Sequence, residues 1–186
     1  MKTLVLTGAS GGLGTEVVAY LSREYHCIPG GRGEAPPDER VYGAVLLAGA
    51  FAMGASLDTF ANMLDANLMS AVRVIEPMRS RIEDGGRIVA ISSAASLTKP
   101  GGMAAYVASK AALNAYIEAL SRELQPRRIT VNALLPTALD TPAMRKSAPR
   151  ESLVPLERVS ETIAFLLRPE AQAVTGQLIA LVGDRH

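Results

Sequence analysis

The chain has 186 residues, 48% of them hydrophobic and 20% charged, a composition typical of a globular protein with a core of its own. Its formal net charge of +1 gives no electrostatic reason to expect binding to nucleic acid or to an anionic membrane. The single cysteine, Cys27, excludes an internal disulfide and fits a reducing compartment, and the two histidines lie too far apart in sequence to suggest a metal site.

The N-terminal stretch MKTLVLTGAS leads directly into an expected strand and does not resemble a signal peptide. No apolar run approaches the roughly 18 residues of a membrane span. We therefore expect a cytoplasmic protein with a single domain over residues 1–186, without a partner membrane or nucleic acid and without a metal.

Short apolar runs bounded by glycine, proline or polar residues predict buried strands over residues 3–7, 26–28, 44–48, 87–92, 129–135 and 177–182. Helical periodicity lies between them, over residues 13–24, 57–81, 103–124 and 155–167. Pro29 should cut the second strand short, Pro77 should kink or split the long helix, and Gly85-Gly86 should break the chain before the fourth strand. This alternation predicts an α/β fold, a Rossmann-like doubly wound parallel sheet with helices on both faces.

The stretch TGASGGLG joins the first strand to the first helix. In open parallel sheets, ligands bind at the carboxyl ends of the strands. Glycines there let backbone amides approach a diphosphate, and the helix N-terminus adds a positive dipole. An ordinary tight turn is the alternative interpretation, but the position between strand and helix favours a dinucleotide site.

Tyr106 and Lys110 are four residues apart in the helix 103–124, so their side chains emerge on one face. Two solvated helix residues would show the same spacing. However, Ser92 and Ser93 end the preceding strand, where a hydroxyl can face the phenol. An ammonium about 4 Å away could lower the pKa of a tyrosine by about three units, enough for acid/base work near neutral pH.

The order of these motifs resembles the short-chain dehydrogenase/reductase superfamily, over almost the whole chain. Thr7 to Gly14 match its T-G-x-x-x-G-x-G motif, Ser93 stands 13 residues before Tyr106 as in the family, and Asn67 matches its helix asparagine. NALLPT, residues 132–137, resembles N-x-x-x-P-G, with Thr137 in place of the last glycine. VTGQ, residues 174–177, resembles the lead-in to the last strand.

The resemblance implies specific roles. Tyr106 would be the general acid/base, Lys110 would lower its pKa and hold the nicotinamide ribose, and Ser93 would orient the carbonyl or alcohol. Asn67 would hold a kinked helix and a water in a proton relay. The implied cofactor-binding residues are Gly8, Ser10, Gly12, Leu13, Gly14, Arg32, Ala48, Gly49, Tyr106, Lys110, Pro136, Thr137, Leu139 and Thr141.

Two departures from the family pattern stand out. Only about 18 residues, Tyr25 to Tyr42, lie between the first helix and the strand at residues 44–48, so a helix-strand-helix segment on the adenosine side is expected to be missing or vestigial. Weaker cofactor binding should follow. Arg32 occupies the position that is usually acidic and suits a 2′-phosphate, which favours NADP(H) over NAD(H).

The second departure is LLAG, residues 46–49, where the family usually has N-N-A-G. Dihydropteridine reductases also lack the asparagine before A-G, and residues 134–149 resemble the matching segment of those enzymes. However, those enzymes lack the catalytic serine, which this chain has as Ser93. Pterin reduction is therefore an alternative to the expected interconversion of a carbonyl and an alcohol. A non-catalytic binding or regulatory protein is the other alternative.

The substrate is not specified by the sequence. Its pocket should be lined by the segment after Thr141 and by five apolar residues, which are Phe51, Met53, Ala94, Leu97 and Met103. The helix 103–124 also carries a flank of small residues that permits close packing. Family members pair this helix between subunits, so we expect a homodimer or homotetramer.

Overall fold

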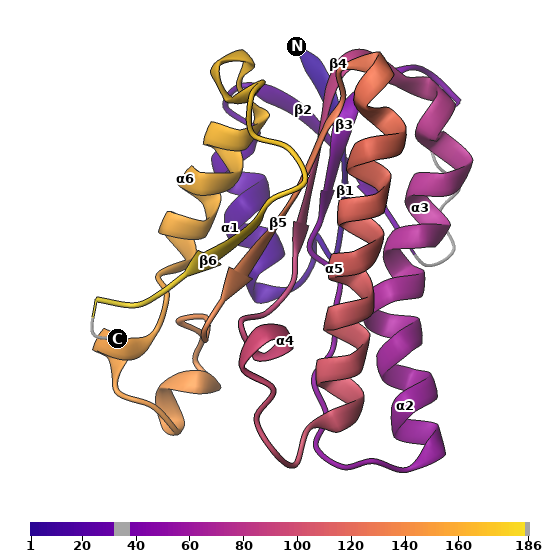
Figure 1. Ribbon diagram of the computed structural model, residues 1–186. Coiled ribbons are helices and arrows are strands. Elements are labelled where there is room, and N and C mark those ends of the chain that lie inside the picture. The colour runs from indigo at the N-terminus through magenta and orange to yellow at the C-terminus, as the bar shows by residue number, and fades with distance from the viewer. Residues whose placement is uncertain (32–37, 185–186) are drawn as a thin grey trace.

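The computed structural model describes residues 1–31 and 38–184, and its centre is one parallel β-sheet. The strand order is β2-β1-β3-β4-β5-β6, with neighbours in parallel register throughout (Figure 1). The strands are β1 (Lys2–Thr7), β2 (Tyr25–Gly30), β3 (Val41–Leu46), β4 (Ile82–Ile91), β5 (Thr130–Pro136) and β6 (Leu178–Leu181). From β1 the chain first adds β2 on one side and then β3 to β6 on the other, so the topological switch point lies between β1 and β3. Open parallel sheets bind ligands at such a point.

Helices cover both faces of the sheet (Figure 1). One face carries α1 (Gly12–Leu21) and α6 (Leu156–Leu167), and the other carries α3 (Ser70–Met78) and α5 (Ala104–Leu124), with α2 (Leu57–Leu64) beside α5. The short elements are η1 (Asp65–Met69), η2 (Arg79–Arg81), α4 (Ala95–Thr98), η3 (Gln125–Arg127), η4 (Met144–Lys146), η5 (Arg150–Ser152) and η6 (Pro169–Ala171). The predicted Rossmann-like fold is confirmed.

Alternation along each strand divides the core into two clusters, because successive strand side chains point to opposite faces. Val5 packs with the α3 and α5 side, whereas Leu4 and Leu6 pack with the α1 and α6 side. All three side chains are at most 1% exposed. The sheet is thus sealed on both faces, and polar side chains at its carboxyl edge are held by rigid strands.

The second strand is longer than predicted. Pro29 does not end it, because β2 runs to Gly30 and pairs Pro29 with Leu6 and Gly30 with Thr7. In the described part of the chain β2 has only one neighbour, so an edge position tolerates the missing N–H of proline. The connection to β3 passes through residues 32–37, outside the described residues, so the loss of a helix-strand-helix segment stays a prediction.

The Gly85-Gly86 pair also does not break the chain. Both glycines lie inside β4, where the register against β3 shifts between Val41 and Gly43. A Cβ at Gly86 would lie 2.5 Å from the carbonyl oxygen of Tyr42, so the irregular pairing brings two backbones together where only glycine fits.

The long helix 57–81 is irregular, but not where proline predicts. A π-helical turn, η1 (Asp65–Met69), separates α2 from α3, while Pro77 sits in the last turn of α3, one residue before the helix ends at Met78. Proline cannot donate to the carbonyl four residues before it, and α3 ends one residue after this missing hydrogen bond. Within residues 1–31 and 38–184, no helix is both long and apolar enough to cross a membrane.

Candidate active site

The glycine-rich loop between β1 and α1 has a backbone that only glycine can supply at two positions. Gly8 has φ +67°, and a Cβ there would lie 2.8 Å from the amide nitrogen of Ala48. A Cβ at Gly14 would overlap the carbonyl of Gly8. The loop is closed by a hydrogen bond of 3.1 Å from the amide of Gly11 to the carbonyl of Gly8. These contacts bring the start of α1 against the end of β1.

The N-terminus of α1 is open. Gly11 precedes the helix, no side chain caps its first turn, and a Cβ added at Gly12 would meet nothing within 4 Å. The first backbone N–H groups of a helix have no intrahelical partner and carry a partial positive charge. This loop therefore fits the diphosphate of a dinucleotide, which needs close backbone approach and amide donors.

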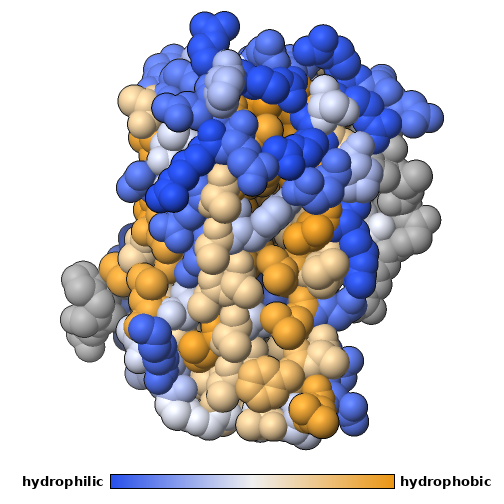
Figure 2. Space-filling model, turned by 45° about the vertical axis from the view of Figure 1, so that its right-hand side comes forward, coloured by the Kyte–Doolittle hydropathy of each residue, from blue (hydrophilic) through white to orange (hydrophobic). Residues whose placement is uncertain are grey.

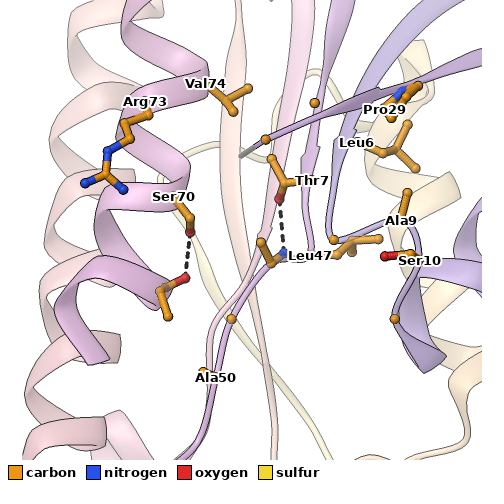
Figure 3. A pocket seen from close by; sticks show the side chains of 17 residues that line it. Leu6, Thr7, Ala9, Ser10, Pro29, Leu47, Ala50, Ser70, Arg73 and Val74 are labelled. Atoms are coloured by element: carbon orange, nitrogen blue, oxygen red, sulfur yellow. Dashed lines mark hydrogen bonds between the residues drawn. The ribbon is translucent and has the colours of Figure 1, made fainter. Parts of the chain in front are cut away.

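A cavity of about 710 Å³ lies beside this loop, at the carboxyl ends of β1, β2 and β3 (Figure 3). Of the predicted cofactor residues, Gly8, Ser10, Ala48 and Gly49 line it, and Ala66, Ser70, Arg73 and Val74 close it from the helical side. The hydroxyl of Thr7 accepts a hydrogen bond of 3.0 Å from the amide of Ala48, tying the loop after β3 to β1. The volume suits part of a nucleotide cofactor.

Asn67, in the π-helical turn, is 1% exposed and fully engaged. Its Oδ1 accepts from the amide of Ala50 at 3.0 Å, and its Nδ2 donates to the carbonyl of Ala50 at 3.0 Å and to the hydroxyl of Ser109 at 3.0 Å. Ser109 in turn donates to the carbonyl of Tyr106 at 2.8 Å. Asn67 thus joins the loop after β3 to the turn of α5 that carries Tyr106.

Lys110 is 5% exposed and points to the end of β4, where its Nζ donates to the carbonyl of Ile91 at 2.9 Å. A Cβ at Gly49 would lie 3.1 Å from that nitrogen and 2.7 Å from Oδ1 of Asn67, so glycine leaves room for both groups. Burial lowers the pKa of Lys110 to about 8, because desolvation disfavours the ammonium.

Tyr106 lies one helical turn before Lys110, with its ring edge-on to Phe51 at a centroid distance of 5.0 Å. The expectation that Lys110 lowers its pKa is wrong for this structure. Burial raises the pKa of Tyr106, and only a hydrogen bond with Ser93 acts in the opposite direction. The physical reason is that desolvation of the phenolate outweighs the available partners, while the buried amine is directed to a backbone carbonyl.

The two serines after β4 face different ways. The hydroxyl of Ser92 is directed inward, 3.4 Å from the carbonyl of Lys110. The hydroxyl of Ser93 accepts from the amide of Ala95 at 3.2 Å and is hydrogen-bonded with Tyr106. Ser93, the serine chosen from the sequence spacing, is thus the one placed beside the phenol.

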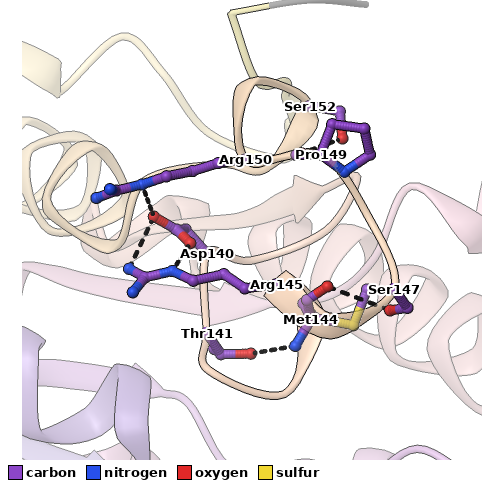
Figure 4. A network of polar contacts seen from close by, with 8 residues as sticks. All are labelled: Asp140, Thr141, Met144, Arg145, Ser147, Pro149, Arg150 and Ser152. Atoms are coloured by element: carbon purple, nitrogen blue, oxygen red, sulfur yellow. Dashed lines mark hydrogen bonds and ion pairs between the residues drawn. The ribbon is translucent and has the colours of Figure 1, made fainter.

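The segment after β5 is held by ion pairs (Figure 4). Asp140, whose side chain is 9% exposed, binds Arg145 at 2.5 Å and Arg150 at 3.4 Å. These arginines lower the pKa of Asp140. The hydroxyl of Thr141 accepts from the amide of Met144 at 3.3 Å, and Leu139 pairs with Val154.

Nine of the predicted cofactor residues are not among those that line the cavity, although some of them adjoin lining residues. They are Gly12, Leu13, Gly14, Tyr106, Lys110, Pro136, Thr137, Leu139 and Thr141. Arg32 lies outside the described residues. In the described ranges, no group of three or more His, Cys, Asp or Glu side chains could hold a metal ion.

A family model described as enoyl-(acyl carrier protein) reductase matches residues 42–183. The chain belongs to the short-chain dehydrogenase/reductase superfamily.

Among relatives within the short-chain dehydrogenase/reductase superfamily, a cyclic-di-GMP-binding biofilm dispersal mediator protein of Escherichia coli is 33% identical, covering 75% of this chain and 65% of that protein. A 3-oxoacyl-[acyl-carrier-protein] reductase of Aggregatibacter actinomycetemcomitans is 32% identical, covering 69% and 53%. The chain thus spans between half and two thirds of the length of these relatives. The crystal structure of BdcA in complex with NADPH has the same fold, with a TM-score of 0.82, 23% identity and coverage of 98% and 93%.

Sequence reasoning missed Ser109, which contacts two of the predicted residues of this site. Ser109 is fully buried and links Asn67 to the backbone of Tyr106. Its position just before Lys110 was a usable signal, because a buried serine on the inner face of a helix needs a polar partner.

Proposed function

We propose that the protein is an NADP(H)-dependent oxidoreductase that interconverts a carbonyl and an alcohol, with Tyr106 as the general acid/base. One observation carries the proposal. The phenol of Tyr106 shares a hydrogen bond with Ser93, and Asn67 and Lys110 meet beside Gly49, at the edge of the glycine-loop cavity. Four polar side chains from three elements converge at the place where open sheets bind ligands.

The raised pKa of Tyr106 supports the reductive direction. A phenol that stays protonated at neutral pH can donate its proton to a carbonyl oxygen as charge develops there. When a substrate is bound, the hydroxyl of Ser93 can turn its one proton from Tyr106 to the same oxygen and donate a second hydrogen bond there. When bound, NADPH would supply the hydride.

Lys110 and Asn67 contribute differently. Lys110, with its pKa near 8, keeps a positive charge at neutral pH behind the phenol. Asn67 fixes the peptide of Ala50 next to the cavity. In this assignment Lys110 also holds the nicotinamide ribose, and the glycine loop holds the diphosphate through its amides.

The preference for NADP(H) rests on Arg32 in the sequence and on the NADPH-bound structure with the same fold. Calorimetric titration with NADPH and NADH tests it. Tighter binding of NADPH is expected, and binding of neither nucleotide would remove the oxidoreductase assignment.

Tyr106→Phe tests the chemistry. We expect turnover with NADPH and a carbonyl substrate to fall by about 10²-fold or more, since general acid catalysis contributes that much, while cofactor binding persists. Tyr116→Phe is the matched control, because Tyr116 is on the same helix and its hydroxyl donates to Glu76 at 2.7 Å, away from the cavity. Equal rates for both variants would contradict the assignment.

A second candidate is a nucleotide-binding protein without turnover. The relative named as a cyclic-di-GMP-binding protein favours it, together with the short connection between β2 and β3. Titration with cyclic-di-GMP separates the two candidates. Binding of this dinucleotide with no binding of NADPH would support the second.

We also propose a homodimer. Five alanines of α5 are exposed and form a stripe down the helix: Ala104, Ala108, Ala111, Ala115 and Ala119. Figure 2 shows a pale orange stripe on the face formed by α5 and α2, with darker apolar patches beside it. Leu57 in α2 is 89% exposed. Light scattering that gives a monomeric mass at micromolar concentration would contradict the dimer.

A further inference from the structure

A buried chain of hydrogen bonds links α5 to the residue beside Tyr106. Nδ2 of Asn114 lies 2.8 Å from the hydroxyl oxygen of Ser96, and that hydroxyl donates to the carbonyl of Ser93 at 2.6 Å. Ser93, Ser96 and Asn114 are at most 6% exposed. Asn114 is one turn beyond Lys110, which is itself one turn beyond Tyr106, so one helix carries the phenol, the amine and this anchor.

The direction of each proton in the chain is fixed. An amide Nδ2 can only donate and a carbonyl can only accept, so the hydroxyl of Ser96 must accept from Asn114 and donate to Ser93. The side chain of Ser93 accepts from the amide of Ala95. Its own proton stays free to be donated, and the hydrogen bond with Ser93 lowers the pKa of Tyr106, as a donor to the phenolate does. The link from Asn114 through Ser96 therefore ends at the carbonyl of Ser93, and it affects the hydroxyl of Ser93 through the position of the backbone.

We propose that Asn114 and Ser96 are positioning residues that direct the hydroxyl of Ser93 at Tyr106. The inference rests on the proposed function for its catalytic meaning. It adds two residues that touch neither substrate nor cofactor. They act by holding the short turn between β4 and α4 in place. The position of this turn sets the orientation of both the carbonyl and the hydroxyl of Ser93.

A purely structural role fits this geometry less well. Oδ1 of Asn114 is buried and has no hydrogen-bond partner in the described structure, so this amide costs stability that an apolar residue of similar size would not. What the amide supplies in return is a donor aimed at Ser96. The turn has other ties, from the amide of Ala94 to the carbonyl of Pro136 at 3.1 Å and from the amide of Ala95 to the hydroxyl of Ser93 at 3.2 Å, but both donors are backbone amides. Ser96 and Asn114 supply side-chain hydrogen bonds to this turn.

The first test needs neither cofactor nor substrate. Ultraviolet titration of the phenols, as the difference between each protein and the same protein with Tyr106→Phe, isolates the ionisation of Tyr106. Ser93→Ala should raise that pKa by about one unit, the effect of losing one donor to a charged group. Ser96→Ala should raise it in the same direction, although the Ser93 side chain is intact.

Asn114→Asp and Asn114→Leu sharpen the test. An aspartate cannot donate, so the hydroxyl of Ser96 would turn toward it and abandon the carbonyl of Ser93. Both variants should shift the titration of Tyr106 as Ser96→Ala does, and combining Asn114→Leu with Ser96→Ala should add nothing further. Ser121→Ala is the control, because its buried hydroxyl on the same helix donates to the carbonyl of Glu118 at 2.7 Å and has no other hydrogen bond among the described residues.

The second test is kinetic, with NADPH and a small dicarbonyl compound as probe. Ser96→Ala should lower kcat and shift the pH profile with the titration, while KM for NADPH is unchanged. An unshifted phenol in Ser96→Ala and both Asn114 variants, with folding confirmed by circular dichroism, would overturn the inference. If wild-type protein reduces no carbonyl probe, the proposed function fails, and the titration still decides whether the chain orients Ser93.

Discussion

The side-chain amide of Asn67 forms two hydrogen bonds with the backbone of Ala50, accepting from its amide and donating to its carbonyl, each at 3.0 Å. The pairing resembles that between two strands, but it joins a π-helical turn to a loop. It fixes the peptide that follows Gly49 at the edge of the cavity. A third bond, to Ser109, extends the link to α5.

Removing this link should destabilise the protein strongly. We expect Asn67→Ala to lower the unfolding free energy by about 2–4 kcal/mol, because it leaves buried backbone groups of Ala50 unpaired. Denaturant unfolding measures the loss. Asn62→Ala, at an exposed position of α2, is the control and should change the value by less than about 0.5 kcal/mol. A similar small change for Asn67→Ala would contradict the structure.

The glycine loop offers a test that separates binding from folding. Gly12→Ala should keep or slightly raise the melting temperature, because a Cβ there meets no atom and alanine favours a helix. It should nevertheless weaken NADPH binding, since the methyl group occupies the open face of the helix start. Gly14→Ala should instead impair folding, because its Cβ overlaps the loop backbone. Thermal melts and calorimetry on both variants give the answer, and equal loss of stability would refute it.

Lys110 should make stability depend on pH. Its pKa in the folded protein is about 8, below the value of about 10.4 for an unfolded chain, so between these values the unfolded chain binds more protons. Raising the pH through this window therefore favours folding, by about 2 kcal/mol between about pH 7.5 and 9.5. The wild-type protein should show this rise relative to Lys110→Met, measured by denaturant unfolding. Lys146→Met, at an exposed position, should not alter it.

Asp140 should protect the segment after β5 from proteolysis. Asp140→Asn weakens the ion pairs with Arg145 and Arg150, so trypsin should cleave after Arg145, Lys146 or Arg150 faster than in wild-type protein. Mass spectrometry of the fragments locates the cut. Asp184→Asn, which disrupts the exposed pair with Arg158, serves as the control. Unchanged cleavage would show that the segment is held by its backbone contacts alone.

Much of this fold could be predicted from the sequence, because both the apolar runs of its strands and the apolar spacing along its helices are clear. Fully apolar runs such as AVLL predict buried parallel strands, and the face of α5 with Leu113, Ile117 and Leu120 is buried as its spacing predicts. The breaks were read less well. Pro29 and Gly85-Gly86 are tolerated inside strands by an edge position and an irregular register, which depend on neighbours that are remote in sequence.

The candidate site, too, could be predicted from the sequence only in part. The placement of Ser93 beside Tyr106 followed from a motif with fixed spacing. The direction of the Tyr106 pKa could not be predicted, because burial depends on how Phe51 and the loop after β3 cover the ring. Asn114 and Ser96 escaped notice because their partnership joins positions 18 residues apart across a loop.

The π-helical turn at Asp65–Met69 also sets the helical phase of everything that follows it. One residue more or less in an α-helix rotates the subsequent side chains by about 100°. Val74, Ile75 and Met78 reach the core with the phase that this wider turn supplies. A continuous α-helix over the same residues, with no wider turn, would therefore rotate these side chains off the sheet, so the irregularity holds the whole of α3 in register with the site.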